Sequence, residues 1–268
     1  MRFLLVLLTI IAILCPQARA AEWTEEGRAL MMKVMREATH KKPDFMQPYS
    51  EPMENGRGFF LIWKPEGETP SRWIVSLPGS NGLVSDELSL WGNALEGRHV
   101  GIVEVQWWMG TGDQIQDYMS PFEVYRELKS FLPRLGVKEG HAMLHGFSRG
   151  SANIYSIAAV DHVFGNKFFD VVVANSGGAN LGYPPTRDIE IGRLGAQPYL
   201  GMRWVTVCGE KDPNPERDGC PAMRRTAEWI AKQGGTVVMA IEDAKHGHGA
   251  LHTNIDNANK LLDWYLAD

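Results

Sequence analysis

The sequence predicts an α/β domain with a mostly parallel sheet that is covered by helices on both faces. From about residue 57 onward, short apolar runs alternate with amphipathic stretches, which is typical of strands that take turns with helices. Runs such as Asp170-Val171-Val172-Val173 are almost continuously apolar, as expected for strands buried on both faces. No internal repeat or long linker divides the 268 residues, so we expect one domain.

The predicted elements follow one another along the chain. Residues 22–40 have helical spacing and predict an N-terminal helix. The expected strands are residues 58–63, 72–77, 100–105, 141–145, 170–174, 203–208 and 236–241. The expected helices are residues 121–135, 152–163, 222–233 and 254–265. Residues 177–201 break this rhythm, and we expect either a short excursion over the site or one further helix.

The first 20 residues have the pattern of a cleaved secretory signal. Arg2 precedes an apolar run over residues 3–14, and Ala18-Arg19-Ala20 forms an A-x-A cleavage site. A helix of that length spans about 18 Å, well short of a hydrocarbon core of about 30 Å, which argues against a membrane anchor. We therefore expect cleavage after Ala20, leaving residues 21–268 as a single secreted or periplasmic domain without a membrane span.

Two cysteines remain after the signal is removed. Cys15 leaves with the signal, whereas Cys208 and Cys220 stay in the exported chain, where the compartment permits oxidation. A disulfide between them would close a short loop and stabilise the fold by about 3 kcal/mol. The alternative is a pair of free thiols, with Cys208 buried at a strand end.

The charge of the chain argues against a nucleic-acid partner. There are 27 Lys and Arg against 32 Asp and Glu, a formal net charge of −5. The sequence also has no basic run of the kind that follows phosphates.

The sequence Gly146-Phe147-Ser148-Arg149-Gly150 is a G-x-S-x-G motif. A predicted strand leads into it and a predicted helix leads out, which is the setting of a nucleophile elbow. There the serine sits on a sharp, strained turn with its Oγ exposed near a helix N-terminus. The alternative is an ordinary glycine-rich turn in which the serine caps the helix.

A serine nucleophile needs a base, and the base needs an acid to orient it. Asp212 and Glu210 lie just after the strand 203–208, and we favour Asp212 because the following Pro213 disfavours helical backbone there. His246 and His248 follow the strand 236–241. A metal bound by this His-x-His pair is not expected, since no third ligand is indicated nearby.

Two backbone amides are candidates for an oxyanion hole. One is the N–H of Arg149, the residue after the nucleophile. The other lies in the glycine-rich loop after the strand 72–77, where we favour the N–H of Ser80 over that of Asn81. A plain surface turn is the alternative for this loop.

The chain resembles the α/β-hydrolase superfamily over about residues 57–268. The resemblance rests on the G-x-S-x-G motif, the loops of Asp212 and His248, and Leu77-Pro78-Gly79-Ser80. His248-Gly249-Ala250 also resembles the end of prolyl-oligopeptidase-like catalytic domains, which favours His248 over His246. The family pattern implies an eight-stranded, mostly parallel sheet with a Ser-Asp-His triad at the carboxyl ends of the strands. The chain lacks the His-Gly-Gly-Gly loop of hormone-sensitive-lipase-like esterases, which argues against that branch.

Secreted members of the superfamily include carboxylesterases, feruloyl esterases and polyhydroxyalkanoate depolymerases. The resemblance therefore implies a secreted serine hydrolase that cleaves small or polymeric esters without a metal or cofactor. The alternatives are a prolyl-oligopeptidase-like peptidase and a binding protein that has lost its chemistry. Trp107 and Trp108 follow the strand 100–105, where they would line an apolar substrate pocket or pack in the core. Tyr183 and Tyr199 are further candidates.

Overall fold

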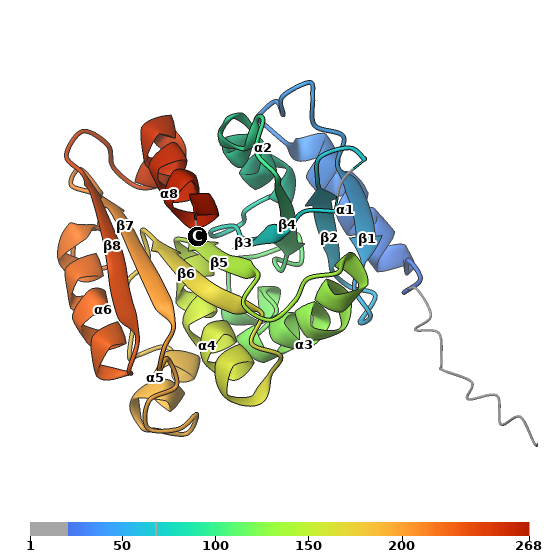
Figure 1. Ribbon diagram of the computed structural model, residues 1–268. Coiled ribbons are helices and arrows are strands. Elements are labelled where there is room, and N and C mark those ends of the chain that lie inside the picture. The colour runs from blue at the N-terminus through green and yellow to red at the C-terminus, as the bar shows by residue number, and fades with distance from the viewer. Residues whose placement is uncertain (1–20, 68, 268) are drawn as a thin grey trace, which may run out of the picture.

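A twisted sheet of eight strands forms the centre of the molecule, with helices on both faces (Figure 1). The computed structural model describes residues 21–67 and 69–267, so the signal-peptide prediction for residues 1–20 lies outside the described residues. Within those two ranges, no helix has the length and apolar character that a membrane crossing requires.

The strand order is β1-β2-β4-β3-β5-β6-β7-β8. β1 and β2 are antiparallel to each other, β2 is antiparallel to β4, and all later neighbours are parallel. The mostly parallel sheet predicted from the sequence is therefore confirmed. The strands are β1 (Tyr49–Pro52), β2 (Phe59–Trp63), β3 (Arg72–Leu77), β4 (Val100–Gln106), β5 (Ala142–Phe147), β6 (Phe169–Asn175), β7 (Arg203–Gly209) and β8 (Thr236–Asp243).

The helices divide between the two faces of the sheet, and each face has its own apolar core. The α-helices are α1 (Glu25–Glu37), α2 (Val84–Leu95), α3 (Pro121–Phe131), α4 (Arg149–Phe164), α5 (Pro184–Glu190), α6 (Cys220–Lys232), α7 (Ala250–Thr253) and α8 (Ile255–Ala267), and two 3-10 turns cover Ile115–Asp117 and Leu132–Leu135. Helices α3, α4, α5 and α6 pack on one face, and α1, α2, α7 and α8 on the other. Neighbouring strand residues such as Trp73 and Ile74 belong to opposite cores, because side chains alternate along a strand.

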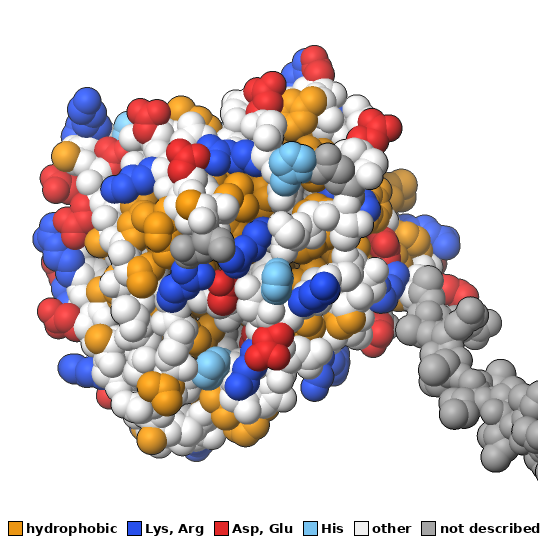
Figure 2. All heavy atoms as spheres, in the orientation of Figure 1, with side chains coloured by type: hydrophobic (Ala, Val, Ile, Leu, Met, Phe, Trp, Pro, Cys, Tyr) orange, Lys and Arg blue, Asp and Glu red, His pale blue; other side chains and the backbone are white. Residues whose placement is uncertain are grey.

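Residues 177–201, left open by the sequence, contain the short helix α5 and pass beside the nucleophile turn. Their first part, through Pro185, helps to line the cleft described below. On the face shown in Figure 2, basic and acidic side chains are interspersed. Neither sign forms a continuous field on that face.

Candidate active site

Ser148 lies at the turn between β5 and α4 with a strained backbone. Its φ of 53° and ψ of −114° fall outside the regions that a non-glycine residue normally adopts. The Ser148 N–H donates to the carbonyl oxygen of Asn175 at 2.8 Å, which ties the turn to the neighbouring strand β6. The side chain is partly exposed at the N-terminus of a 16-residue helix, where developing negative charge is stabilised.

The two glycines of the motif are required by close backbone contacts. A Cβ on Gly146 would lie 2.5 Å from the carbonyl oxygen of Gly150. A Cβ on Gly150 would overlap the carbonyl oxygen of Leu77 on β3. The strand and the helix can approach closely enough to form the sharp turn only because both side chains are absent.

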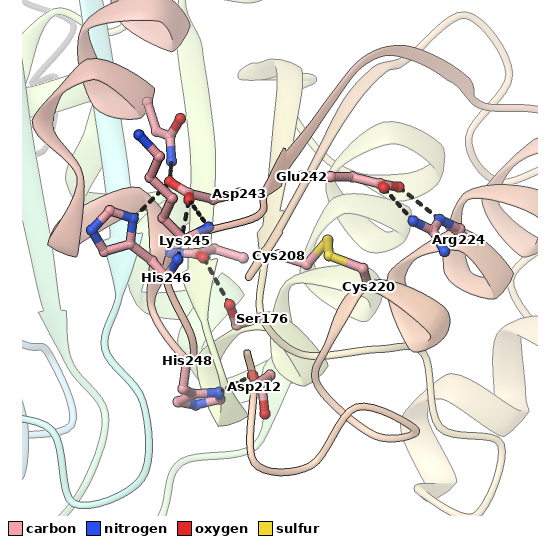
Figure 3. Close-up of a disulfide and its surroundings, with 12 residues drawn as sticks. Ser176, Cys208, Asp212, Cys220, Arg224, Glu242, Asp243, Lys245, His246 and His248 are labelled. Carbon is pink, nitrogen blue, oxygen red and sulfur yellow. Dashed lines mark hydrogen bonds and ion pairs between the residues drawn. A yellow bond between two sulfur atoms is a disulfide. The ribbon is translucent and has the colours of Figure 1, made fainter. Parts of the chain in front are cut away.

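Asp212 and His248, far apart in the sequence, form a hydrogen-bonded pair (Figure 3). The imidazole Nδ1 of His248 lies 2.7 Å from Oδ2 of Asp212. The other carboxylate oxygen, Oδ1, accepts from the N–H of Asn214 at 2.8 Å. Asp212 is buried, whereas 30% of the His248 side chain is exposed, so the imidazole is fixed on one side and accessible on the other.

The loops that carry these two residues are joined directly to each other. The Lys211 N–H donates to the His246 carbonyl oxygen at 3.1 Å, and the Glu210 N–H donates to the Asp243 carbonyl oxygen at 2.9 Å. A Cβ on Gly209 would overlap the carbonyl oxygens of His246 and Gly247. Glycine at position 209 therefore lets the acid loop and the histidine loop come close enough for the pair to form.

The imidazole of His248 also lies beside the nucleophile turn. Its ring centroid is 5.0 Å from that of Phe147, the residue before Ser148. The next residue, Gly249, donates its N–H to Oγ of Ser176 at 3.3 Å, which ties the histidine loop to the end of β6. Three loops thus meet at the carboxyl ends of β5, β7 and β8.

The alternative acid and base have different surroundings. His246 Nδ1 lies 2.9 Å from Oδ2 of Asp243, on the other side of the loop from Asp212 (Figure 3). The side chain of Glu210 is exposed. The two histidines of the His-x-His sequence are therefore turned toward different carboxylates.

Asp243 is held in its ionised form by the groups around it. Burial acts to raise the pKa of its carboxyl, but the hydrogen bonds that it accepts, from Asn254 and His246 among others, hold this pKa well below its ordinary value. Asn257 also donates to Oδ2, at 2.8 Å. This carboxylate therefore fixes the base of the histidine loop to the end of β8 and the start of α8.

The two candidate oxyanion amides of the β3 loop differ in their partners. The Asn81 N–H donates to the hydroxyl of Tyr118 at 2.9 Å, so this amide is already engaged. Ser80 lines the cleft together with Ser148 and Arg149. A Cβ on Gly79 would lie 3.2 Å from the Cβ of Ser148, which shows how close this loop comes to the nucleophile. These contacts favour Ser80 over Asn81 as the second donor.

A cleft of about 740 Å³ opens next to Ser148. Most of its apolar wall comes from the loop after β4 and from the segment that leads into α5. Neither of these segments carries a recognisable sequence motif. The residues of this wall are Trp107, Ile115, Tyr118, Met119, Ala152, Tyr183, Pro184 and Pro185. Charged residues that also line the cleft are Arg57, Glu123, Arg149, Arg217 and Asp218.

The two consecutive tryptophans lie in different places. Trp107 lines the cleft, and its indole N–H donates to the carbonyl oxygen of Pro78 at 3.0 Å. Trp108 is not among the cleft residues; its indole N–H donates to Gly112, and Lys33 of α1 lies over its ring. Of the two alternatives that the sequence left open, pocket lining describes Trp107, whereas Trp108 packs in the core.

The two tyrosines of residues 177–201 also differ. Tyr183 lines the cleft and donates its hydroxyl proton to Asn153 Oδ1 at 2.7 Å, and burial raises its pKa to about 12. Tyr199 is fully buried and donates to the Tyr155 carbonyl oxygen, so it lies in the core.

The predicted disulfide is confirmed, since Cys208 and Cys220 are bonded with a Cα–Cα distance of 5.1 Å (Figure 3). Cys208 is in β7 and Cys220 begins α6, so the bond closes the loop that carries Asp212. The disulfide therefore restrains the acid loop at both ends.

Comparison with known proteins defines the fold. No family model matches the chain, and no curated protein matches its sequence. Among solved structures, a hyperthermophilic esterase from the archaeon Pyrobaculum calidifontis is similar with a TM-score of 0.60 and 14% identity, covering 90% of this chain and 87% of that one. Fungal esterases from Rhizomucor miehei give 0.61 and 12%, covering 91% and 90%. An esterase/lipase from an uncultured bacterium gives 0.60 and 11%, covering 92% and 93%.

These similarities and the strand topology assign the chain to the α/β-hydrolase fold. At such low sequence identity these similarities show the fold alone, and a shared fold does not determine which reaction a protein catalyses.

Proposed function

We propose that this protein is an exported serine hydrolase that cleaves carboxylic esters through an acyl-enzyme intermediate. The proposal rests mainly on one observation, the hydrogen bond between His248 Nδ1 and Asp212 Oδ2 beside the strained turn of Ser148. The esterases with similar structures support ester hydrolysis in a broad sense.

In the proposed reaction, Ser148 Oγ attacks the ester carbonyl carbon while His248 Nε2 takes the hydroxyl proton. Asp212 holds the imidazole so that Nδ1 keeps its proton and Nε2 is the free base. When the tetrahedral intermediate collapses, the C–O bond to the alcohol breaks and His248 returns the proton to the departing oxygen. A water molecule, deprotonated by His248, then attacks the acyl-serine ester, and as the bond to Ser148 Oγ breaks, His248 returns the proton to that oxygen and the acid is released.

The negative charge of each tetrahedral intermediate would be held by the backbone N–H groups of Arg149 and Ser80. Each such donor contributes about 3 kcal/mol to stabilisation of the transition state. The position of Ser148 at the N-terminus of α4 adds a favourable helix dipole.

The cleft supports a substrate with an apolar or aromatic acyl or alcohol group. Trp107, Tyr118 and Tyr183 give it an aromatic lining, and its volume of about 740 Å³ suits a ligand of moderate size. The chain length of the ester is left to experiment.

Labelling with a fluorophosphonate probe tests the nucleophile. We expect one equivalent of label on Ser148 in the folded protein, and none in Ser148→Ala or in the heat-unfolded wild type. Ser130→Ala, on α3 and away from the cleft, is the matched control and should be labelled like the wild type. Folded wild-type protein that is not labelled, and does not hydrolyse p-nitrophenyl esters, would overturn the proposal.

The resemblance of His248-Gly249-Ala250 to prolyl-oligopeptidase-like domains supports a peptidase as the second candidate. Rates on p-nitrophenyl esters and on peptide anilides of matched acyl groups separate the two activities. Dominant anilide cleavage would favour the peptidase.

A binding protein that has lost its chemistry is the third candidate. If Ser148→Ala retained the full biological activity of the wild type, a binding function would replace the enzymatic one.

Export is supported by the signal pattern of residues 1–20 and by the disulfide. N-terminal sequencing of the protein recovered from an oxidising compartment should begin at Ala21, and an intact Met1 would contradict export.

A further inference from the structure

A second group of ionisable side chains lies in the interior, between the sheet and helices α2 and α7. It consists of Ser76, Glu87, Glu104, His145 and His252, which we call the Glu87 cluster. Ser76 of β3 is the register partner of Glu104 on β4 and of His145 on β5, so these three side chains project from neighbouring strands on one face. Glu87 comes from α2 and His252 from α7.

The cluster is almost completely removed from solvent. The side chains of Glu87 and His252 are each 3% exposed, and Ser76, Glu104 and His145 are 0% exposed. Trp91 covers both imidazoles edge-on, with ring centroids 5.1 Å from His145 and 5.8 Å from His252. Burial of two carboxyl groups and two imidazoles is strongly unfavourable unless charge and hydrogen bonds compensate it.

The potential ligand atoms converge on one point. Oε1 of Glu87 lies 3.1 Å from Nε2 of His252 and 3.6 Å from Nδ1 of His145, and all three atoms lie within 4.8 Å of one another. Bonds of about 2.0–2.2 Å at tetrahedral angles place zinc ligands about 3.3–3.5 Å apart. The two separations to Glu87 lie close to this range.

The hydrogen bonds of the protein leave part of this cluster unsatisfied. Within the described part of the chain, neither carboxyl oxygen of Glu104 has a hydrogen-bond partner of good geometry, and the same holds for both ring nitrogens of His252. Both the charge of Glu87 and the hydroxyl of Ser76 act on the Glu104 carboxyl. A fully buried carboxyl group without a partner is rare and requires a physical explanation.

We propose that the Glu87 cluster is a binding site for one divalent transition-metal ion of the zinc type. The ligands are Oε1 of Glu87, Nδ1 of His145 and Nε2 of His252. Two imidazoles and one carboxylate, with a fourth position left open, are a donor set that suits Zn²⁺, and the charge of the ion would stabilise the neighbouring carboxylate of Glu104. The Asn175 side-chain amide nitrogen lies 3.3 Å from Nε2 of His145, and Ser76 Oγ lies 3.0 Å from Nδ1, and these two contacts fix the orientation of the ring.

The ion would have a structural role, because it would help to hold the loop that carries His248. His252 lies on α7, four residues after His248, and its ring also contacts Phe147, with a centroid distance of 5.5 Å. A metal bond from His252 to α2 and β5 would therefore anchor the far end of the histidine loop. The inference does not depend on the proposed reaction, because metal binding can be measured in a protein without the Ser148 hydroxyl.

A proton is the competing explanation for the unsatisfied carboxyl. Burial, together with the charge of Glu87, raises the pKa of Glu104 well above its ordinary value, so a neutral Glu104 could occupy this interior without an ion. The two explanations differ in one measurable quantity, the metal content of the folded protein.

The experiment uses Ser148→Ala protein, unfolded with its disulfide intact in the presence of a chelator and refolded with Zn²⁺, with Co²⁺ or without metal. We expect about one equivalent of bound metal after dialysis, a melting temperature several degrees higher with metal, and the visible absorption bands of four-coordinate Co²⁺. Refolded protein that binds less than a tenth of an equivalent of either ion would overturn the proposal and favour the proton.

Matched variants assign the metal to this cluster. Glu87→Gln preserves the shape of the side chain and removes the charge, and we expect it to retain less than a tenth of the wild-type metal. His246→Asn removes a histidine outside the cluster and should retain one equivalent. Equal metal content in both variants would mean that the ion binds elsewhere. If Glu87→Gln does not fold, the metal content and Co²⁺ spectrum of the parent protein still decide the question.

Discussion

Replacement of Asp212 by asparagine tests the geometry on which the proposed chemistry depends. Oδ1 of Asp212 accepts from the Asn214 N–H, and Oδ2 accepts from His248 Nδ1. In Asp212→Asn, the amide oxygen must stay toward the Asn214 N–H, since the NH₂ group there would oppose another donor. The NH₂ group then faces His248 Nδ1 and forces that nitrogen to become an acceptor. The proton moves to Nε2, which can no longer take a proton from Ser148.

The expected loss follows from this change of tautomer. The same replacement in a serine protease triad lowers kcat by about 10⁴-fold. At 1.36 kcal/mol for each factor of ten, this corresponds to about 5.4 kcal/mol of transition-state stabilisation. We therefore expect kcat for a p-nitrophenyl ester to fall by about 10³–10⁴-fold in Asp212→Asn, with KM changed much less. Stopped assays at high enzyme concentration can measure such a residual rate.

Glu210→Gln is the matched control, since it neutralises the exposed acid two residues away. We expect its kcat to stay within about twofold of the wild-type value. Similar circular dichroism spectra and melting curves for the two variants establish that the fold is intact. If Asp212→Asn retained more than a tenth of the wild-type kcat, or if Glu210→Gln lost as much activity, the assignment of the acid would be refuted.

Three further predictions concern the loops around the site. Replacement of Cys208 and Cys220 by serine should lower the free energy of unfolding by about 3 kcal/mol in urea titrations, and an unchanged midpoint would contradict a stabilising disulfide. Gly209→Ala should reduce kcat by about 10²-fold, because the new Cβ would push apart the loops of the acid and the base; wild-type kinetics would show that the backbone adapts. Asp243→Asn should be less stable than the wild type at pH 7, and this difference should narrow as the pH falls below about 4. The pKa of the Asp243 carboxyl is lower in the folded state than in the unfolded state, so the ionised carboxylate stabilises the fold above the unfolded pKa. This stabilisation is lost as the carboxylate is protonated at lower pH. Urea titrations that show the same stability difference between variant and wild type at every pH would refute the prediction.

The strands of the sheet could be predicted because their apolar runs are long and bounded by turns. The observed β3 covers Arg72–Leu77 as expected, and β2 and β7 differ from the prediction by one residue. β1 was not predicted, since its four residues, Tyr49–Pro52, are partly exposed and end on proline, which gives no strand pattern. Helix α2 was also missed: no side chain caps its N-terminus, Gly92 lies within it, and most of its residues are buried.

The site was predictable only where chemistry leaves a local signature. The G-x-S-x-G motif and the strand ends pointed to loops that the structure brings together, but the choice between His246 and His248 depended on a short resemblance. No local pattern could show that Asn81 gives its amide to Tyr118, because that contact joins loops 37 residues apart. No local pattern marks His145 or His252, because their convergence with Glu87 depends on packing between the sheet and two helices.

The segment from the end of β8 to α7 has one feature that unites the site with its surroundings. It carries three histidines, and each faces a carboxylate from a different place in the fold: His246 faces Asp243 of β8, His248 faces Asp212, and His252 faces Glu87 of α2. A base that must take a proton from one fixed hydroxyl needs a loop whose position is determined at several points. The central pair holds the imidazole that is proposed to act on Ser148, so the outer two pairs are expected to act on activity through the position of His248. Variants of Asp243 and Glu87 should therefore lower kcat in proportion to how far they displace the segment that carries His248. Variants of Asp212 should instead abolish proton transfer while this segment keeps its position.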